Sequence, residues 1–479
     1  MADSENPVKK GIFSSVTASY TRTWIISFLL CYIIALISRD SQENFISLAF
    51  ANFLFLFILF AFLWYFCGEP IIRRNLTGRE TWLVAGLTVM YFTGTFFVRF
   101  ISDTGIPASV VIPTALVILI PSIIINPRLA LVLAMALPTG TLLIGFYDIA
   151  SYFFALVSGV VAAYSLQGAE KRNDLIKAGL IIAGANLAAM IAVLLWQDRA
   201  AAIYPLALFW AALNGVASGM LVLGVLPPLE QALNAATSFR LIELSDLNVP
   251  LLRRLFTQAP GTYSHSIMVA NLAETACQDI GANPLLARVG AYYHDLGKLE
   301  NPEYFVENQR DYNIHDSMEA RLSAAVIRNH VKLGEEKARQ HKLPPEVINI
   351  ISEHHGDSMI TWFYNKALKQ YEETKTTPVH MEDYKYPGNP PRSRESGIVM
   401  LADITEAAVR SLDKPTKNEM ENFIDDLFTK KVEHGQLSQS ELTFRDLAKI
   451  KNSFVKVLSG HYHSRIEYPE QGKTGKKKS

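Results

Sequence analysis

Cysteine is scarce in this chain, which has only Cys31, Cys67 and Cys277 among its 479 residues. No two of them lie at the spacing of a metal-binding pair, so we interpret all three as structural thiols. Net charge is lacking as well, because 45 basic residues balance 45 acidic ones. A neutral chain has no long-range attraction for a phosphate polymer, so we expect no nucleic acid polymer among its partners.

Charged residues are scarce in the first half of the chain: residues 1–226 carry 24 of the 90. Such a break in charge density marks the end of a membrane domain. A bilayer core requires about 20 apolar residues per helix. After an N-terminal segment 1–22, we therefore predict a domain of about eight membrane helices at 23–226. The expected spans are 23–38, 45–66, 81–101, 106–125, 128–147, 149–166, 176–197 and 204–226.

The positive charges between these spans are unevenly distributed. With the N-terminus inside, ten Lys and Arg residues fall on inside segments and three on outside segments. This bias agrees with the positive-inside rule, and an even number of spans returns the second half of the chain to the cytoplasm.

The second half is expected to be helical, because its apolar residues recur every 3.6 residues. We therefore predict an all-α protein, with a helical connector at 227–260, a helical domain at 261–470 and a basic, disordered tail at 471–479. In the connector one helix from Leu229 to Gln258 would either pack at the membrane surface or transmit a signal. The proline-rich segment from Lys375 to Arg394 predicts a loop, either over the site or on the surface.

Histidine is absent from the first 264 residues and occurs 11 times after them. Four helices in this part of the chain are each expected to present an imidazole or carboxylate at an inward-facing position, where burial is costly unless something binds it. Seven such groups are about right for two divalent ions, and mixed nitrogen and oxygen ligands around two metals suit the hydrolysis of phosphate esters. The seven are His265, His294, Asp295, His330, His354, His355 and Asp403.

Their local settings follow from the apolar pattern. His265 is expected near the start of a helix, and His294 and Asp295 at the end of a helix that Gly297 stops. His330 is expected to close a helix that begins at Met318.

The last three candidates follow apolar runs. His354 continues a buried stripe, and His355 is turned roughly 100° from it. Asp403 follows an apolar run and is expected to face inward. The other six histidines are interpreted as surface or packing residues; they are His315, His341, His380, His434, His461 and His463.

The order of these residues and their neighbours resembles a known family. The stretches that carry the resemblance are Tyr263-Ser264-His265-Ser266, Asn271-Leu272-Ala273-Glu274, residues 290–298 with Tyr293-His294-Asp295, Glu353-His354-His355-Gly356, Met400-Leu401-Ala402-Asp403 and residues 462–469. They are similar to the PgpH-type 7TM-HD family of the HD superfamily, membrane phosphodiesterases that degrade cyclic di-AMP in bacteria.

The resemblance implies roles for the candidates. One metal would be held by His265, His294, Asp295 and Asp403, and the other by His330, His354, His355 and Asp295. Asp295 would thus bridge both ions, which would be Mn²⁺ or Fe²⁺/Fe³⁺ and would activate a shared water. Lys298 is either a phosphate contact or an exposed lysine. The expected product is pApA, made at the cytoplasmic side of the bacterial inner membrane.

One departure and several alternatives remain at this point. Members of that family carry a large extracytoplasmic domain after the first span, where this chain has only residues 39–44. Other HD hydrolases act on cyclic di-GMP or (p)ppGpp, although the Gly-Tyr-Pro signature of the cyclic di-GMP enzymes is replaced here by Asn301-Pro302-Glu303. A membrane nucleotide receptor without catalysis is a third reading, and a homodimer is compatible with the sequence.

Overall fold

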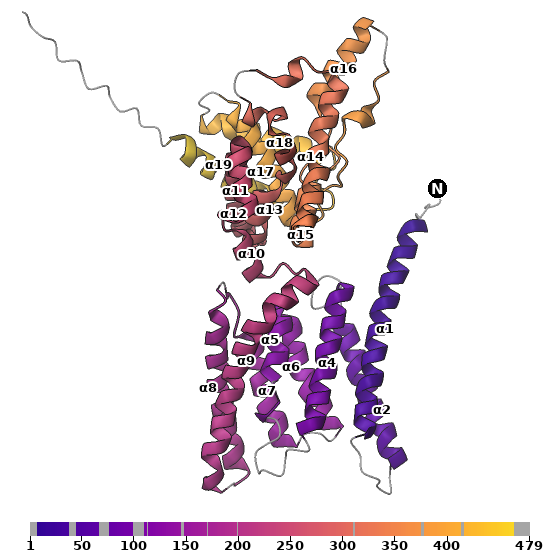
Figure 1. Ribbon diagram of the computed structural model, residues 1–479, viewed down its shortest axis with the longest axis vertical. Coiled ribbons are helices and arrows are strands. Elements are labelled where there is room, and N and C mark those ends of the chain that lie inside the picture. The colour runs from indigo at the N-terminus through magenta and orange to yellow at the C-terminus, as the bar shows by residue number, and fades with distance from the viewer. Residues whose placement is uncertain are drawn as a thin grey trace, which may run out of the picture. The chain divides into compact units, whose positions relative to one another are not determined.

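The structure is a computed structural model. It describes residues 7–37, 45–66, 76–98, 110–112, 114–144, 148–169, 171–198, 200–309, 312–374, 378–412 and 416–463, without the side chains of 7–20, 374, 462 and 463. Within these ranges the chain is helical, and its only pairing of extended backbone is an isolated antiparallel bridge between Met359 and Lys385. The predicted all-α class is confirmed (Figure 1).

The chain divides into two compact units, Met1–Phe239 and Arg240–Ser479. Each of the eight predicted spans of the first unit overlaps one long helix. These helices are α1 (Pro7–Ile37), α2 (Phe45–Phe66), α4 (Gly78–Val98), α5 (Thr114–Ile124), α6 (Pro127–Leu143), α7 (Ile149–Tyr164), α8 (Asp174–Trp196) and α9 (Tyr204–Leu233), the last preceded by the short η3 (Ala201–Ile203).

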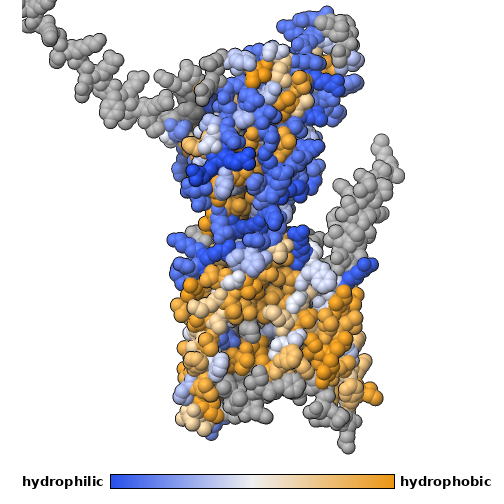
Figure 2. Space-filling view, in the orientation of Figure 1, coloured by the Kyte–Doolittle hydropathy of each residue, from blue (hydrophilic) through white to orange (hydrophobic). Residues whose placement is uncertain are grey.

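By length and composition, four of these helical segments could cross a membrane: α2, α4, α8 and Ala201–Leu233. The other four are shorter apolar helices when only residues with described side chains are counted: Thr21–Ile37, Thr114–Ile124, Pro127–Leu143 and Ile149–Tyr164. The count of eight spans therefore stays a prediction. Figure 2 shows a largely hydrophobic surface on the visible face of this unit. Its helices approach closely: a Cβ added at Gly215 of α9 would lie 2.3 Å from the backbone nitrogen of Ala183 in α8. Small residues at such contacts are typical of packed membrane helices.

The predicted continuous helix from Leu229 to Gln258 is wrong. Helix α9 ends at Leu233, and two separate helices follow, α10 (Ser238–Leu244) and α11 (Pro250–Gln258). Between α10 and α11 the Asp246 carboxylate accepts a hydrogen bond from the backbone nitrogen of Asn248 at 2.9 Å. This local turn competes with a helix, and Pro250 then starts α11. Leu247, which lies within the predicted helix, is 38% exposed as a result.

The second unit is built from helices and short 3₁₀ segments. The helices after α11 are α12 (Pro260–Ile280), α13 (Pro284–Tyr293), α14 (Ala320–Gln340), α15 (Pro345–Glu353), α16 (Thr361–Thr374), α17 (Arg394–Arg410), α18 (Lys417–Glu433) and α19 (Phe444–His463). The 3₁₀ segments are η4 (Leu296–Glu300), η5 (Pro302–Tyr304), η6 (Val306–Asn308), η7 (Ile314–Asp316) and η8 (Met381–Tyr384).

Helix α12 is central to this unit, because it packs against α13, α17 and α19. Its apolar face, including Val269 and Leu272, is fully buried in a core with Met400 of α17 and Phe454 of α19. Pro260 stands at the first turn of α12, where a missing backbone N–H costs nothing. The predicted tail 471–479 lies outside the described residues.

Candidate active site

His265, His294 and Asp295 lie close to the helix ends that the sequence predicted. His265 is in the second turn of α12, which begins at Pro260. Helix α13 ends at Tyr293, so that His294 and Asp295 follow it directly and are both buried.

The sequence suggested that Gly297 stops α13, but this helix has already ended at Tyr293. Gly297 lies inside η4, and a Cβ at this position would be 1.8 Å from the carbonyl oxygen of His330. The glycine therefore permits η4 to press against α14.

His330 does not close its helix; it lies in the middle of α14, which continues to Gln340. Gly334 lies inside this helix and faces η4: a Cβ added to it would lie 3.2 Å from the backbone nitrogen of Gly297. The last turns contain strong helix formers and the ion pair between Arg339 and Glu335. Helix α14 ends only where Lys342 adopts a left-handed backbone conformation, with φ of 54°.

The other three candidates lie where the apolar pattern placed them. His354 follows α15 and is fully buried, whereas the His355 side chain is 18% exposed. Asp403 lies in α17 and is buried. All seven predicted ligands are thus brought together from α12, α13, α14, α15 and α17. Of the six other histidines, none belongs to a candidate metal cluster within the described residues.

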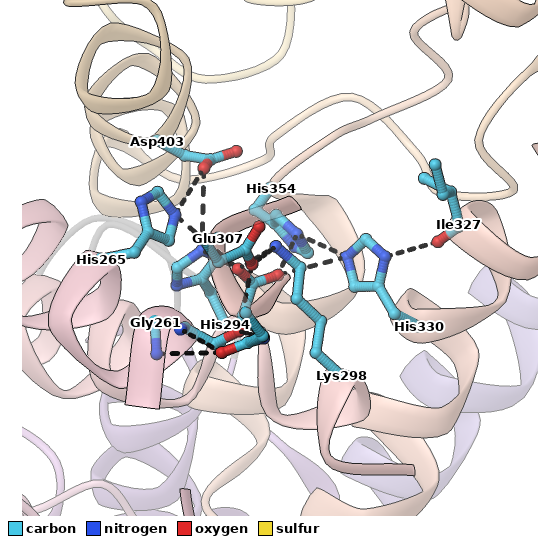
Figure 3. Close-up of polar contacts among 12 residues, drawn as sticks. Gly261, His265, His294, Lys298, Glu307, Ile327, His330, His354 and Asp403 are labelled. Atoms are coloured by element: carbon cyan, nitrogen blue, oxygen red, sulfur yellow. Dashed lines mark hydrogen bonds and ion pairs between the residues drawn. The ribbon is translucent and has the colours of Figure 1, made fainter. Parts of the chain in front are cut away.

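The seven side chains form two groups around Asp295. One oxygen of this carboxylate, Oδ2, lies 3.2 Å from His294 Nε2 and 3.7 Å from His265 Nε2. The other, Oδ1, lies 3.4 Å from His330 Nε2 and 3.8 Å from His354 Nε2. Figure 3 shows these rings converging. Asp295 is therefore placed between two sets of ligands, one to each oxygen.

Asp403 joins the first set and His355 the second. Asp403 Oδ1 lies 3.0 Å from His265 Nε2, and Asp403 Oδ2 lies 3.5 Å from His355 Nδ1. The ligand atoms of His265, His294 and Asp403 lie within 4.8 Å of one another, and so do those of His330, His354 and His355. Either set has the size and the donor types for one divalent ion.

Backbone carbonyls orient three of the imidazoles. The Nδ1 atoms of His294, His330 and His354 donate to the carbonyls of the residues three positions earlier, at 2.7, 2.6 and 2.7 Å. In its neutral form, each ring then presents the lone pair of Nε2 to the site. The Nε2 atoms of His330 and His354 face each other at 3.3 Å. Two lone pairs at this distance repel unless a cation lies between them, so these residues fit a metal.

The electrostatics of the buried site agree with metal binding. Burial raises the pKa of Asp295 and Asp403, but the surrounding imidazoles outweigh this and hold both values well below the ordinary range. Burial lowers the pKa of His330 to about 4 and that of His354 to about 3. Ionised carboxylates and neutral imidazoles are the forms that bind metals. His294 differs: burial lowers its pKa, but Asp295 raises it to about 10, so a metal ion would displace a proton there.

Lys298 is not an exposed lysine, because its side chain is only 13% exposed and touches two carboxylates. Its Nζ lies 2.7 Å from Asp295 Oδ2 and 2.8 Å from Glu307 Oε1. Burial alone would lower the pKa of Lys298, but these two carboxylates raise it above its ordinary value. The site therefore carries a fixed positive charge beside Asp295.

Three further residues at the site were missed by the sequence reasoning. Glu307 holds Lys298, and Glu406 is hydrogen-bonded to His265 Nδ1. The ring of Tyr386 stacks on His355, with centroids 4.1 Å apart. Only Glu406 had a usable signal, since it lies three residues after Asp403 on the same helical face. Tyr386 belongs to the predicted loop 375–394, so the part of this loop around Tyr386 lies against the site.

Comparison with known proteins gives two family matches. Residues 20–237 match the model described as "7TM receptor with intracellular HD hydrolase", and residues 262–408 match the model of the HD domain.

Named relatives match across both units. The chain is 39% identical over 330 residues to the cyclic-di-AMP phosphodiesterase PgpH of Bacillus subtilis, which covers 68% of this chain and 45% of the relative. It is 34% identical over 363 residues to the protein of that name from Listeria monocytogenes, covering 75% and 50%. The chain thus spans about half the length of these relatives.

A solved structure of the L. monocytogenes PgpH HD domain in complex with cyclic di-AMP is also similar. It is 38% identical, covers 45% of this chain and 99% of that one, and has a TM-score of 0.42.

Proposed function

We propose that this chain, which belongs to the family of 7TM receptors with an intracellular HD hydrolase, is a membrane-bound phosphodiesterase that hydrolyses cyclic di-AMP to pApA. The observation that carries the proposal is the position of Asp295, whose two oxygens face separate sets of imidazoles. One carboxylate shared by two ligand sets is the arrangement of a two-metal hydrolase. The names of the relatives support cyclic di-AMP as the substrate.

Each predicted ligand has a place in this proposal. His265, His294 and Asp403 would hold one ion, His330, His354 and His355 the other, and Asp295 both. Bound Mn²⁺ or Fe²⁺/Fe³⁺ ions would supply Lewis-acid activation of water and neutralise phosphoryl charge. The backbone carbonyls keep the imidazoles in the binding tautomer, and Lys298 contributes an ammonium for a phosphoryl oxygen.

The exposed fractions indicate the side from which substrate reaches the site. The side chains of His294, Asp295, His330 and His354 are at most 2% exposed. Those of Lys298, His355 and Asp403 are 13%, 18% and 9% exposed. A phosphodiester entering past Lys298 and His355 would therefore meet an ammonium and both ligand sets at once.

We further propose that the domains are arranged as the sequence indicates. A membrane domain at 23–226 would locate a cytoplasmic HD domain at 261–470, with both termini inside. A reporter fused after Ser479 tests this topology: activity of a reporter that works only in the cytoplasm is expected. Activity of one that works only outside would overturn the count of eight spans.

The substrate assignment is tested by initial rates on cyclic di-AMP, cyclic di-GMP and (p)ppGpp in manganese buffer. We expect the fastest turnover with cyclic di-AMP and none with (p)ppGpp. Base choice depends on the pocket wall rather than on the metals, and unpaired polar groups give large preferences. Faster turnover of cyclic di-GMP would contradict the substrate and leave the metal chemistry standing.

The same samples distinguish an enzyme from a nucleotide receptor. A metal-loaded chain that binds cyclic di-AMP and releases no pApA would support the receptor reading. Metal analysis is expected to give two ions per chain, and one ion per chain would contradict the shared role of Asp295.

A further inference from the structure

Glu307 is the second carboxylate that contacts Lys298, in addition to Asp295. Its Oε1 lies 2.8 Å from Lys298 Nζ, and its own side chain is 9% exposed (Figure 3). It is not part of any cluster of candidate metal ligands within the described residues. Its ion pair with Lys298 therefore links Glu307 to the candidate ligands.

Glu307 is itself fixed by the first turn of α12. Thr262 Oγ1 donates to Glu307 Oε1 at 3.0 Å. The neighbouring Asn308 accepts hydrogen bonds from the backbone nitrogens of Gly261 and Thr262, at 2.9 and 3.2 Å. The first backbone N–H groups of a helix have no partner within it, so Asn308 caps α12 from a distant part of the chain.

The contact between these two segments is too close for a side chain at position 261. A Cβ added to Gly261 would lie 1.9 Å from the carbonyl oxygen of Glu307. Segment η6, which carries Glu307, and α12, which carries His265, consequently form one rigid frame. The same contact between η6 and α12 therefore positions both Glu307, which is the partner of Lys298, and His265, which is a candidate metal ligand.

We propose that Glu307 is a positioning residue, which holds the Lys298 ammonium at the open side of the site so that it contacts the phosphoryl oxygens of the substrate. The role rests on the proposed phosphodiesterase function. Asp295 cannot fulfil it alone, because metal ions would compete with Lys298 for Asp295 Oδ2. Glu307 has no such competitor, so it keeps a flexible lysine in place when the ligands are occupied.

A double-mutant cycle on the full-length chain in lipid nanodiscs tests this role. Lys298→Ala, Glu307→Ala and the double variant are compared with wild type in manganese buffer. The substrates are cyclic di-AMP and bis(p-nitrophenyl) phosphate, a diester that needs no base recognition. We expect Lys298→Ala to lower kcat/KM by about 100-fold, as for loss of one charge-stabilising donor. Glu307→Ala should lower it roughly 10- to 100-fold, because the ammonium is misplaced.

The decisive result is the behaviour of the double variant. If Glu307 acts through Lys298, the double variant stays within about threefold of Lys298→Ala, since coupled residues are not additive. If the loss of kcat/KM in the double variant instead equals the product of the losses in the two single variants, the proposal is overturned. Metal content must remain at the wild-type value in Glu307→Ala, and loss of metal also overturns it, because Glu307 would then act on the ligands.

Two variants control for folding and for charge. Glu303→Ala removes an exposed carboxylate from η5, in the same segment, and is expected to leave kcat/KM unchanged. Glu307→Gln keeps an acceptor for Thr262 and should retain the fold while losing part of the rate, so the cycle can be repeated with it if Glu307→Ala is unstable.

The two substrates separate failure of this role from failure of the proposed function. If the wild-type protein cleaves neither diester, both the role of Glu307 and the proposed phosphodiesterase function are overturned. Wild type that cleaves only bis(p-nitrophenyl) phosphate contradicts cyclic di-AMP as substrate, and the cycle on the second diester then still decides the role of Glu307.

Discussion

The Nδ1 atom of His265 is hydrogen-bonded to the Glu406 carboxylate, while the Nε2 atom of the same ring lies 3.0 Å from Asp403 Oδ1. Asp403 and Glu406 are both on α17, one turn apart. One helix thus provides a candidate ligand beside the ring and the carboxylate that orients the ring. The imidazoles of His294, His330 and His354 are instead oriented by backbone carbonyls. Among these four rings, a substitution of the orienting side chain is therefore possible only for His265.

Glu406→Ala should therefore weaken metal binding without removing a ligand. Loss of an outer partner of a metal-binding histidine typically costs about 10- to 100-fold in metal affinity or activity. Manganese titration of the metal-free variant measures this directly. Glu433→Ala, which removes an exposed carboxylate from α18, is the matched control and should bind as wild type does. Equal affinities in the two variants would show that Glu406 does not support His265.

Asp295→Ala should be the most damaging change of a single ligand, because it removes an oxygen from both ligand sets. His355→Ala removes a ligand from one set only. Metal analysis of the purified variants is expected to show loss of both ions in the first and of one ion in the second. Two ions per chain in Asp295→Ala would refute the shared role of this carboxylate.

Gly297→Ala should destabilise the HD unit, because its Cβ would overlap the carbonyl oxygen of His330 at 1.8 Å. Backbone cannot move aside cheaply, and overpacking of this kind costs about 1–3 kcal/mol in free energy of unfolding. Thermal unfolding of the variant measures the loss. Gly460→Ala is the control: this exposed glycine of α19 has no neighbour within 4 Å, so alanine should raise stability by up to about 1 kcal/mol.

A fragment that begins at Arg240 should hydrolyse substrate without the first unit. All seven candidate ligands, Lys298 and Glu307 lie within this compact unit, which has a buried core of its own. The membrane domain would then regulate or locate the activity. A folded, metal-loaded fragment that has no turnover, alongside an active full-length chain, would show that the first unit completes the site.

The sequence alone determined the helical class and the seven candidate ligands. Apolar periodicity depends on local chain geometry, so it correctly placed His354 inward and His355 at an angle to it, and it placed the end of α13 within two residues of Tyr293. It misjudged the end of α14, which continues past His330 to Gln340 and packs there against η4, a contact between segments distant in sequence.

Only the tertiary structure decided which carboxylates serve the ligands and which lysine is buried. Glu307 reaches Lys298 through contacts with α12 that are 45–47 residues apart in sequence, and Glu406 reaches His265 across 141. Tyr386 stacks on His355 from a loop without any periodic pattern. Such pairings depend on how the helices pack. From sequence alone a charged residue is expected to be exposed to solvent, because burial of a charge is costly unless packing provides a partner for it.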